Sequence, residues 1–246
     1  MIENLPITCD FKLMYDYINK LGPLIPVLRI PIIDKTKLKS NHYWIMALVG
    51  KMPNLETLKI HRPQNGKNLG PDGWKFLHKG FTYMKQNGRS LKKLCFSNIM
   101  ANECGEYMYP CLKSLDDLQS IVFNDVSLRM EETKAIGKVL AAFKQVKEID
   151  LSRTNLNSST IKDIADGLMR AKQMEIVKLE GNTAMGVSIN SIIYNLAFSP
   201  RIRYLDLSNI SGTNAETTES LTKLLNISGS IEYLSLSQST CINQLN

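Results

Sequence analysis

Residues 146–173, VKEIDLSRTNLNSSTIKDIADGLMRAKQ, decide the fold of this chain. Their first part carries apolar residues with the spacing of a short buried strand, at Val146, Ile149 and Leu151. Their second part has an apolar i, i+3, i+7 pattern, which predicts one face of a helix. Between the two, Thr160 and Asp163 have the spacing of a helix capping box. A strand, a turn and a helix therefore follow one another within 28 residues.

The same strand pattern, apolar-x-x-apolar-x-apolar, recurs along the whole chain. It starts near residues 2, 27, 55, 91, 118, 146, 174, 202 and 231. A period of this length is typical of a solenoid, in which stacked repeats bury one continuous core. We therefore expect a single domain of about nine repeats over residues 1–246. Because the first strand begins at Ile2 and no helix follows the last one, we also expect the chain to be part of a longer protein.

The dimensions of strands and helices predict the shape of such a stack. Parallel strands pack about 4.8 Å apart and helices about 10 Å apart, so a stack with strands on one side must curve. We expect an α/β fold in which the parallel strands line the concave face and the helices cover the convex face.

The pattern L-x-x-L-x-L followed by a helix at this period resembles the leucine-rich repeats of the ribonuclease-inhibitor type. The stretch from Asn68 to Gly73, NLGPDG, looks like the loop that follows the strand in that subclass. The resemblance implies a horseshoe-shaped solenoid, and the subclass includes Ran GTPase-activating proteins and many scaffold proteins. This chain departs from the family pattern, because the usual Asn in the turn after the strand is found only at Asn182.

Composition limits the classes of protein that remain. The 246 residues are 43% hydrophobic and 22% charged, which is ordinary for a globular chain, and no apolar run is long enough to span a membrane. The N-terminus lacks the features of a secretory signal. Five scattered cysteines favour reduced thiols, so we expect a cytoplasmic protein that does not associate with membranes.

Charge is unevenly distributed along the chain. Residues 1–93 carry 16 Lys and Arg against 6 Asp and Glu, whereas residues 94–246 carry 14 against 17. The first part is therefore basic and the remainder mildly acidic, and this uneven charge suggests neighbours in a larger assembly.

The predicted concave face offers one candidate binding surface. Ile176, Tyr204 and Tyr233 occupy the same position in consecutive repeats, and apolar and aromatic anchors on a polar face are typical of protein-binding patches. The candidate residues on this face are Glu148, Asp150, Ile176, Lys178, Tyr204, Asp206 and Tyr233. Alternatively, the alternating charges in neighbouring repeats form a ladder that only keeps the sheet soluble.

A second candidate surface lies in the one long repeat, where residues 61–67 are inserted before the NLGPDG loop. Extra loops on a solenoid are common recognition sites. The candidate basic residues there are Lys59, His61, Arg62, Lys67, Lys92 and Lys93. Alternatively, the insertion is merely tolerated.

No motif of an enzyme, metal site or cofactor site is present. The histidines lack metal-ligand spacing, no C-x-x-C occurs, and no nucleophile motif is found. The leading hypothesis is a non-enzymatic scaffold that binds other proteins in a multi-subunit complex, and the resemblance suggests a ciliary or cytoskeletal one. The alternatives are a GTPase activator resembling the Ran-specific family, with Arg62 as its candidate residue, and the less favoured binding of nucleic acid by the basic first part.

Overall fold

The computed structural model describes residues 11–32, 44–63, 68–101 and 104–240. Within these ranges, eight parallel strands form one sheet whose order follows the chain from β1 to β8. The strands are β1 (Val27–Pro31), β2 (Thr57–His61), β3 (Lys93–Ser97), β4 (Ser120–Asn124), β5 (Glu148–Asp150), β6 (Ile176–Lys178), β7 (Tyr204–Asp206) and β8 (Tyr233–Ser235). The strand predicted near residue 2 lies outside the described residues. We call the repeats of β1–β4 the front half and those of β5–β8 the back half.

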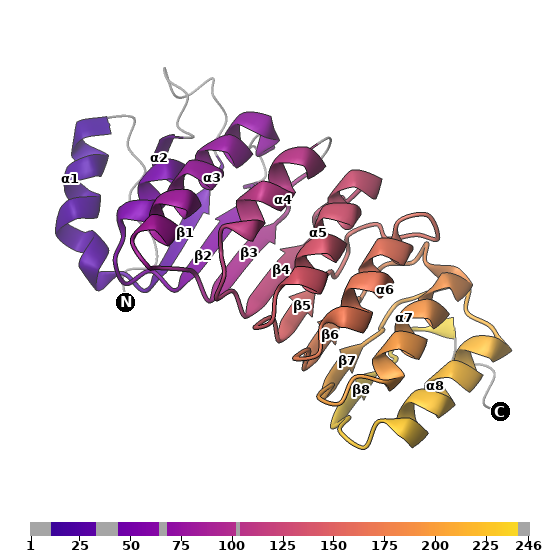
Figure 1. Ribbon diagram of the computed structural model, residues 1–246. Helices are drawn as coiled ribbons and strands as arrows, with labels where there is room; N and C mark the ends of the chain where they lie inside the picture. The colour runs from indigo at the N-terminus through magenta and orange to yellow at the C-terminus, as the bar shows by residue number, and fades with distance from the viewer. Residues whose placement is uncertain (1–10, 33–43, 64–67, 102–103, 241–246) are drawn as a thin grey trace.

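A helix precedes or follows each strand, and the helices form a layer over one face of the sheet (Figure 1). The helices are α1 (Phe11–Leu21), α2 (Trp44–Leu48), α3 (Gly70–Gln86), α4 (Gly105–Lys113), α5 (Met130–Ala142), α6 (Ile161–Arg170), α7 (Ile189–Ala197) and α8 (Ala215–Ile227). Three short 3-10 turns complete the described elements: η1 (Gly22–Leu24), η3 (Val49–Lys51) and η4 (Gly186–Ser188). The predicted α/β leucine-rich-repeat solenoid is confirmed, with strands on one face and helices on the other.

The strand register agrees with the sequence pattern from β2 to β8 and differs at β1. Leu28 pairs with Leu58, and Ile30 pairs with Ile60. This repeat therefore begins at Ile25, two residues earlier than predicted, and Ile25 is fully buried. The sequence allowed the wrong register because apolar residues occupy the pattern positions in both alignments.

One core runs between the sheet and the helix layer. In the front half it contains an aromatic stack in which Trp74 lies 4.9 Å from Phe96, and Phe96 lies 5.1 Å from Phe123, measured between ring centroids. All three side chains are buried. Trp74 therefore packs into the core.

Glycines allow the helices of neighbouring repeats to approach closely. A Cβ atom added at Gly137 in α5 would lie 2.2 Å from the carbonyl oxygen of Asp163, and one added at Gly167 in α6 would lie 2.6 Å from the carbonyl oxygen of Gly137. Any side chain at either position would push α5 and α6 apart.

Asn182 satisfies the backbone of the turn in the back half, as the family pattern implies. Its buried side-chain oxygen accepts the N–H groups of Thr154 at 3.1 Å and Leu156 at 2.9 Å. Its amide donates to the carbonyls of Leu151 and Leu179, both at 2.8 Å. One side chain thus binds four backbone groups in two adjacent repeats.

Turns without this Asn are satisfied in other ways. At the equivalent position, the Ser239 hydroxyl accepts from the N–H of Ile210 and donates to the carbonyl of Leu207. In the front half the position is apolar, and the loop backbones pair directly through a bridge between Met100 and Ser127.

The predicted capping box at α6 does not form. Thr160 is the N-cap residue, but no cap hydrogen bond forms from its side chain, because its hydroxyl instead accepts the N–H of Asn157 at 2.9 Å. A complete capping box is found at α8, where Asn214 and Thr217 bond reciprocally.

Candidate functional site

The face of the sheet opposite the helix layer carries the predicted binding residues; we call it the open face. In its back half, Ile176, Tyr204 and Tyr233 are register neighbours on β6, β7 and β8. The rings of Tyr204 and Tyr233 stack with centroids 4.3 Å apart and planes 10° apart, and Tyr233 is 48% exposed. These three residues form the aromatic patch, whose predicted adjacency the structure confirms.

Charged groups surround the aromatic patch. The Lys178 ammonium lies 5.4 Å from the centroid of the Tyr204 ring and 3.9 Å from the Glu148 carboxylate. Burial, followed by the hydrogen bond with Tyr233, raises the pKa of the Tyr204 hydroxyl. Tyr204 therefore stays protonated at neutral pH and can donate a hydrogen bond.

Asp150 and Asp206 do not form the ion pairs with Lys178 that a ladder of alternating charges would give. Lys178 pairs with Glu148 rather than with either aspartate in the part of the chain that the structure describes. Instead, Asp150 accepts the N–H of Ser152, and Asp206 accepts the N–H of Ser208, both at 2.9 Å. A short side chain just before a turn reaches the backbone two residues on, so these aspartates stabilise the turns.

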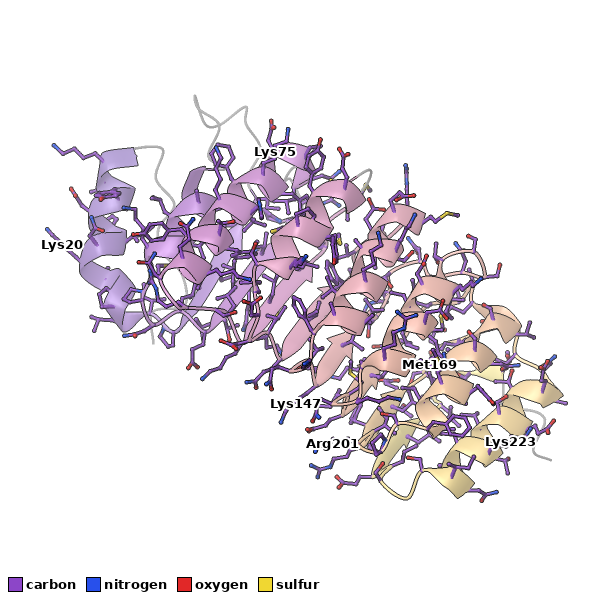
Figure 2. The ribbon with its side chains drawn as sticks, viewed as in Figure 1. Lys20, Lys75, Lys147, Met169, Arg201 and Lys223 are labelled. Carbon is purple, nitrogen blue, oxygen red and sulfur yellow. The ribbon has the colours of Figure 1, made fainter. Side chains whose placement is uncertain are left out.

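Ion pairs do form along the edge of the sheet at which the chain enters the strands. Figure 2 labels Lys147 and Arg201 at this edge. Lys147 lies 3.3 Å from Glu175, and Arg203 donates two 2.8 Å hydrogen bonds to Glu232. A hollow of about 220 Å³ lies between these pairs and the patch, lined by Glu175, Ile176, Arg203, Tyr204, Glu232 and Tyr233. The hollow has an apolar floor and a charged rim.

Glu148 connects the two halves of the open face. It accepts hydrogen bonds from Lys93 at 2.9 Å and from Ser120, both in the front half. Burial alone would raise the pKa of Glu148, but the hydrogen bonds from Ser120 and Lys93 and the charges of Lys93 and Lys178 together lower it. Its carboxylate is thus held ionised in the middle of the sheet.

Two of the predicted basic residues are held in ion pairs with acidic side chains. Lys92 pairs with Glu56 and Lys93 with Glu148, whereas Lys59 is exposed on the open face. Lys67 lies outside the described residues.

His61 and Arg62 are held by neighbouring side chains. Arg29 donates from Nε to Nδ1 of His61 at 3.3 Å, and burial, then the charge of Arg29, lowers the pKa of His61. Arg62 donates to the Asn68 side-chain oxygen at 3.1 Å. The register places Arg29 beside Lys59, a neighbour that the sequence prediction missed because it misaligned β1.

No group of His, Cys, Asp and Glu able to hold a metal ion is found among the described residues. Cys104 and Cys111 are buried in the core, and Cys95 is half-buried on the open face. In the described ranges, no helix has both the length and the apolar character needed to cross a membrane.

Comparisons with known proteins give similarities to solved structures alone. No protein-family model and no curated protein matches this chain. Among solved structures, it is similar to a chain in the crystal structure of the Rad7 and Elc1 complex in yeast, with 16% sequence identity and a TM-score of 0.38. The match covers 91% of this chain and 66% of the other. The function must therefore be argued from this chain's own residues.

Proposed function

We propose that this protein is a non-enzymatic scaffold that binds another protein on the back half of its open face. The observation that carries the proposal is the stacked, solvent-facing pair of Tyr204 and Tyr233 beside Ile176. Tyrosines supply a large contact area at a small cost in conformational entropy, and they are enriched among the residues that dominate binding energy.

The neighbouring contacts define the kind of segment that fits. The hollow beside the patch has room for one apolar or aromatic side chain, because its volume is about 220 Å³. The surrounding charges are already paired, as between Arg203 and Glu232, so an incoming polar segment need not neutralise them. We infer that the partner presents an extended segment with one apolar anchor flanked by polar residues.

The wider setting belongs to the same proposal. The resemblance to repeats of the ribonuclease-inhibitor type favours a cytoplasmic subunit of a larger assembly, ciliary or cytoskeletal. The unequal charge of the two parts of the chain supports more than one neighbour.

The proposal can be tested by photo-crosslinking from native extract. The bait carries a photoreactive residue at position 204, and a matched bait carries it at Tyr83, which is also exposed but lies on helix α3. We expect one protein to crosslink at position 204 and not at position 83. That protein, once purified, should bind the unmodified chain.

The double variant Tyr204→Ala/Tyr233→Ala should then bind the purified partner at least about tenfold more weakly, because such anchors contribute more than about 1 kcal/mol each. The variant Tyr83→Ala should bind like the unmodified chain. Unchanged binding by the double variant would contradict the proposal.

Loss of binding on Lys59→Glu and Arg62→Glu, together with a steep dependence on salt, would instead place the interface on the front half. Assays of GTPase activation and of nucleic-acid binding would then separate the two alternative functions.

A further inference from the structure

Helix α7 differs from its neighbours on the helical face. Its sequence, INSIIYNLA, contains no charged residue, in contrast to every other described helix of nine residues or more. Apolar side chains that face outward lie along this helix and its two ends at helical spacing: Val187 is 48% exposed, Tyr194 58% and Phe198 56%. The rings of Tyr194 and Phe198 meet edge to face at 5.3 Å. A stripe of this kind on an outer helix of a solenoid is typical of an interface.

Two residues of the stripe, Val187 and Tyr194, line a groove between two charged ridges. The groove has a volume of about 690 Å³, and the charged residues that line it are Lys162, Asp166, Glu216, Glu219 and Lys223. Lys162 and Asp166 come from α6, and the other three come from α8. At the end of α7, Phe198 and Ile227 line a second hollow of about 390 Å³, which continues the apolar surface. Figure 2 labels Lys223 on α8, the last helix of the layer.

The charges on each ridge are arranged so that the ridge complements itself. On α6, Lys162 precedes Asp166 by four residues, and on α8, Glu219 precedes Lys223 by four residues and already pairs with it at 2.9 Å within the helix. When a helix packs antiparallel to a copy of itself, each end faces the opposite end. Each lysine would therefore meet an acidic residue of the copy.

The three helices agree on the position of one symmetry axis. The charge pair on α6 is centred at residue 164, the stripe from Val187 to Phe198 between residues 192 and 193, and the pair on α8 at residue 221. The buried leucines Leu168, Leu196 and Leu224 show that the helices are related by 28 residues. The three centres therefore coincide within one residue, which is about 1.5 Å along a helix.

We propose that a second copy of this chain packs on the helical face, related by a two-fold axis that crosses the middle of α6, α7 and α8. Val187 then faces Phe198 of the second copy, and Tyr194 faces its Ser191. Lys162 pairs with Asp166 of the second copy, and Lys223 pairs with its Glu219. The two open faces point away from each other, so the dimer leaves the aromatic patch of each copy accessible.

The first test is the oligomeric state of the chain. Sedimentation equilibrium should show a reversible dimer whose population rises with concentration. Tyr194→Glu should weaken the dimer at least about 100-fold, because it places a charge in the apolar centre twice per dimer. Its thermal unfolding as a monomer should match that of the unmodified monomer, because Tyr194 is exposed. A chain that stays monomeric at all accessible concentrations would overturn the proposal.

The second test uses charge reversal to examine the arrangement itself. Lys162→Glu and Asp166→Lys should each weaken self-association about tenfold, because each brings like charges together twice. Mixing the two variants should restore association as a heterodimer, since the glutamate introduced in one variant then faces the lysine introduced in the other. Lys75→Glu on α3, an equally exposed site on the same face, serves as the control and should change nothing.

The outcomes separate this arrangement from other interfaces. Selective formation of the heterodimer supports the two-fold axis, because no other partner would respond to both reversals in this way. A dimer that forms normally in both single variants, or fails to recover on mixing, would show that the copies do not meet on this face.

Discussion

The front and back halves of the sheet reach the same fold by different chemistry. Strands β1–β4 are five residues long, whereas β5–β8 are three residues long. In the front half, backbone pairing continues into the loops, as at Met100 and Ser127. In the back half, backbone pairing also continues past the short strands, as between Arg153 and Glu180, and the buried Asn182 side chain in addition binds backbone groups of the turn. The comparison teaches that the same backbone pairing between loops can be supplemented by a buried polar side chain in one repeat and by an apolar residue in another.

The largest loss of stability is expected when Asn182, in the back half, is replaced. Asn182→Ala leaves four buried backbone groups without this partner, and we expect a loss of about 3 kcal/mol in the free energy of unfolding. The matched change in the front half, Val126→Ala, removes only buried methyl groups and should cost about 2 kcal/mol or less. Urea denaturation of both variants measures the difference. Equal losses would mean that the two turns do not differ in how they are stabilised.

The second effect tests the junction between the halves, where α5 meets α6. Gly137→Ala places a Cβ atom 2.2 Å from the Asp163 carbonyl, so we expect a loss of about 2 kcal/mol from the forced separation of the helices. Gly229→Ala is the control, because no heavy atom lies within 4 Å of its added Cβ. Thermal unfolding of the two variants should differ clearly, and similar midpoints would contradict the close approach.

The third effect concerns Glu148, which joins the halves across the open face. Its pKa is lowered in the folded protein, so its contribution to stability is present above the ordinary pKa of a glutamate and is lost as the pH falls through the folded value. Glu148→Gln should therefore be less stable than the unmodified chain at pH 7, with the difference shrinking in acid. Denaturation curves at pH 7 and pH 3 provide the check. A difference that stays constant with pH would exclude this role for the carboxylate.

The smallest effect is expected at the exposed pair of Arg203 and Glu232. Both side chains are more than half exposed, so Arg203→Ala should change stability only slightly despite its two hydrogen bonds. The loss of stability caused by Arg203→Ala should be smaller still in high salt, because salt screens the exposed ion pair. A large loss of stability that does not depend on salt would indicate that the pair of Arg203 and Glu232 helps to hold the aromatic patch in place.

Most of the fold could be predicted because the same apolar spacing recurs in every repeat. The buried positions of a strand accept few residue types other than apolar ones. The role of Asn182 was implied by the resemblance to repeats of the ribonuclease-inhibitor type, which usually carry Asn in this turn. The register at Ile25 could not be predicted, since the segment is apolar in two alignments. The hydrogen bonds of Thr160, Asp150 and Asp206 could not either, because short polar side chains choose between several nearby backbone groups.

The candidate sites divide along similar lines. The adjacency of Tyr204 and Tyr233 followed from the repeat alone, since parallel strands in register place equivalent residues side by side. The stripe at Tyr194 and Phe198 was not predicted. The helical pattern identifies which residues are buried, but only the neighbouring helices show that the outward residues line a groove.

The aromatic stack around Trp74 has a practical consequence. Both tryptophans of the chain, Trp44 and Trp74, belong to the front half, whereas the stacked tyrosines belong to the back half. Tryptophan fluorescence therefore follows the unfolding of one half, and the near-ultraviolet circular dichroism of the tyrosine pair follows that of the other. In a stack whose repeats contact only their neighbours, two such signals that separate during denaturation would reveal the end at which the solenoid opens first.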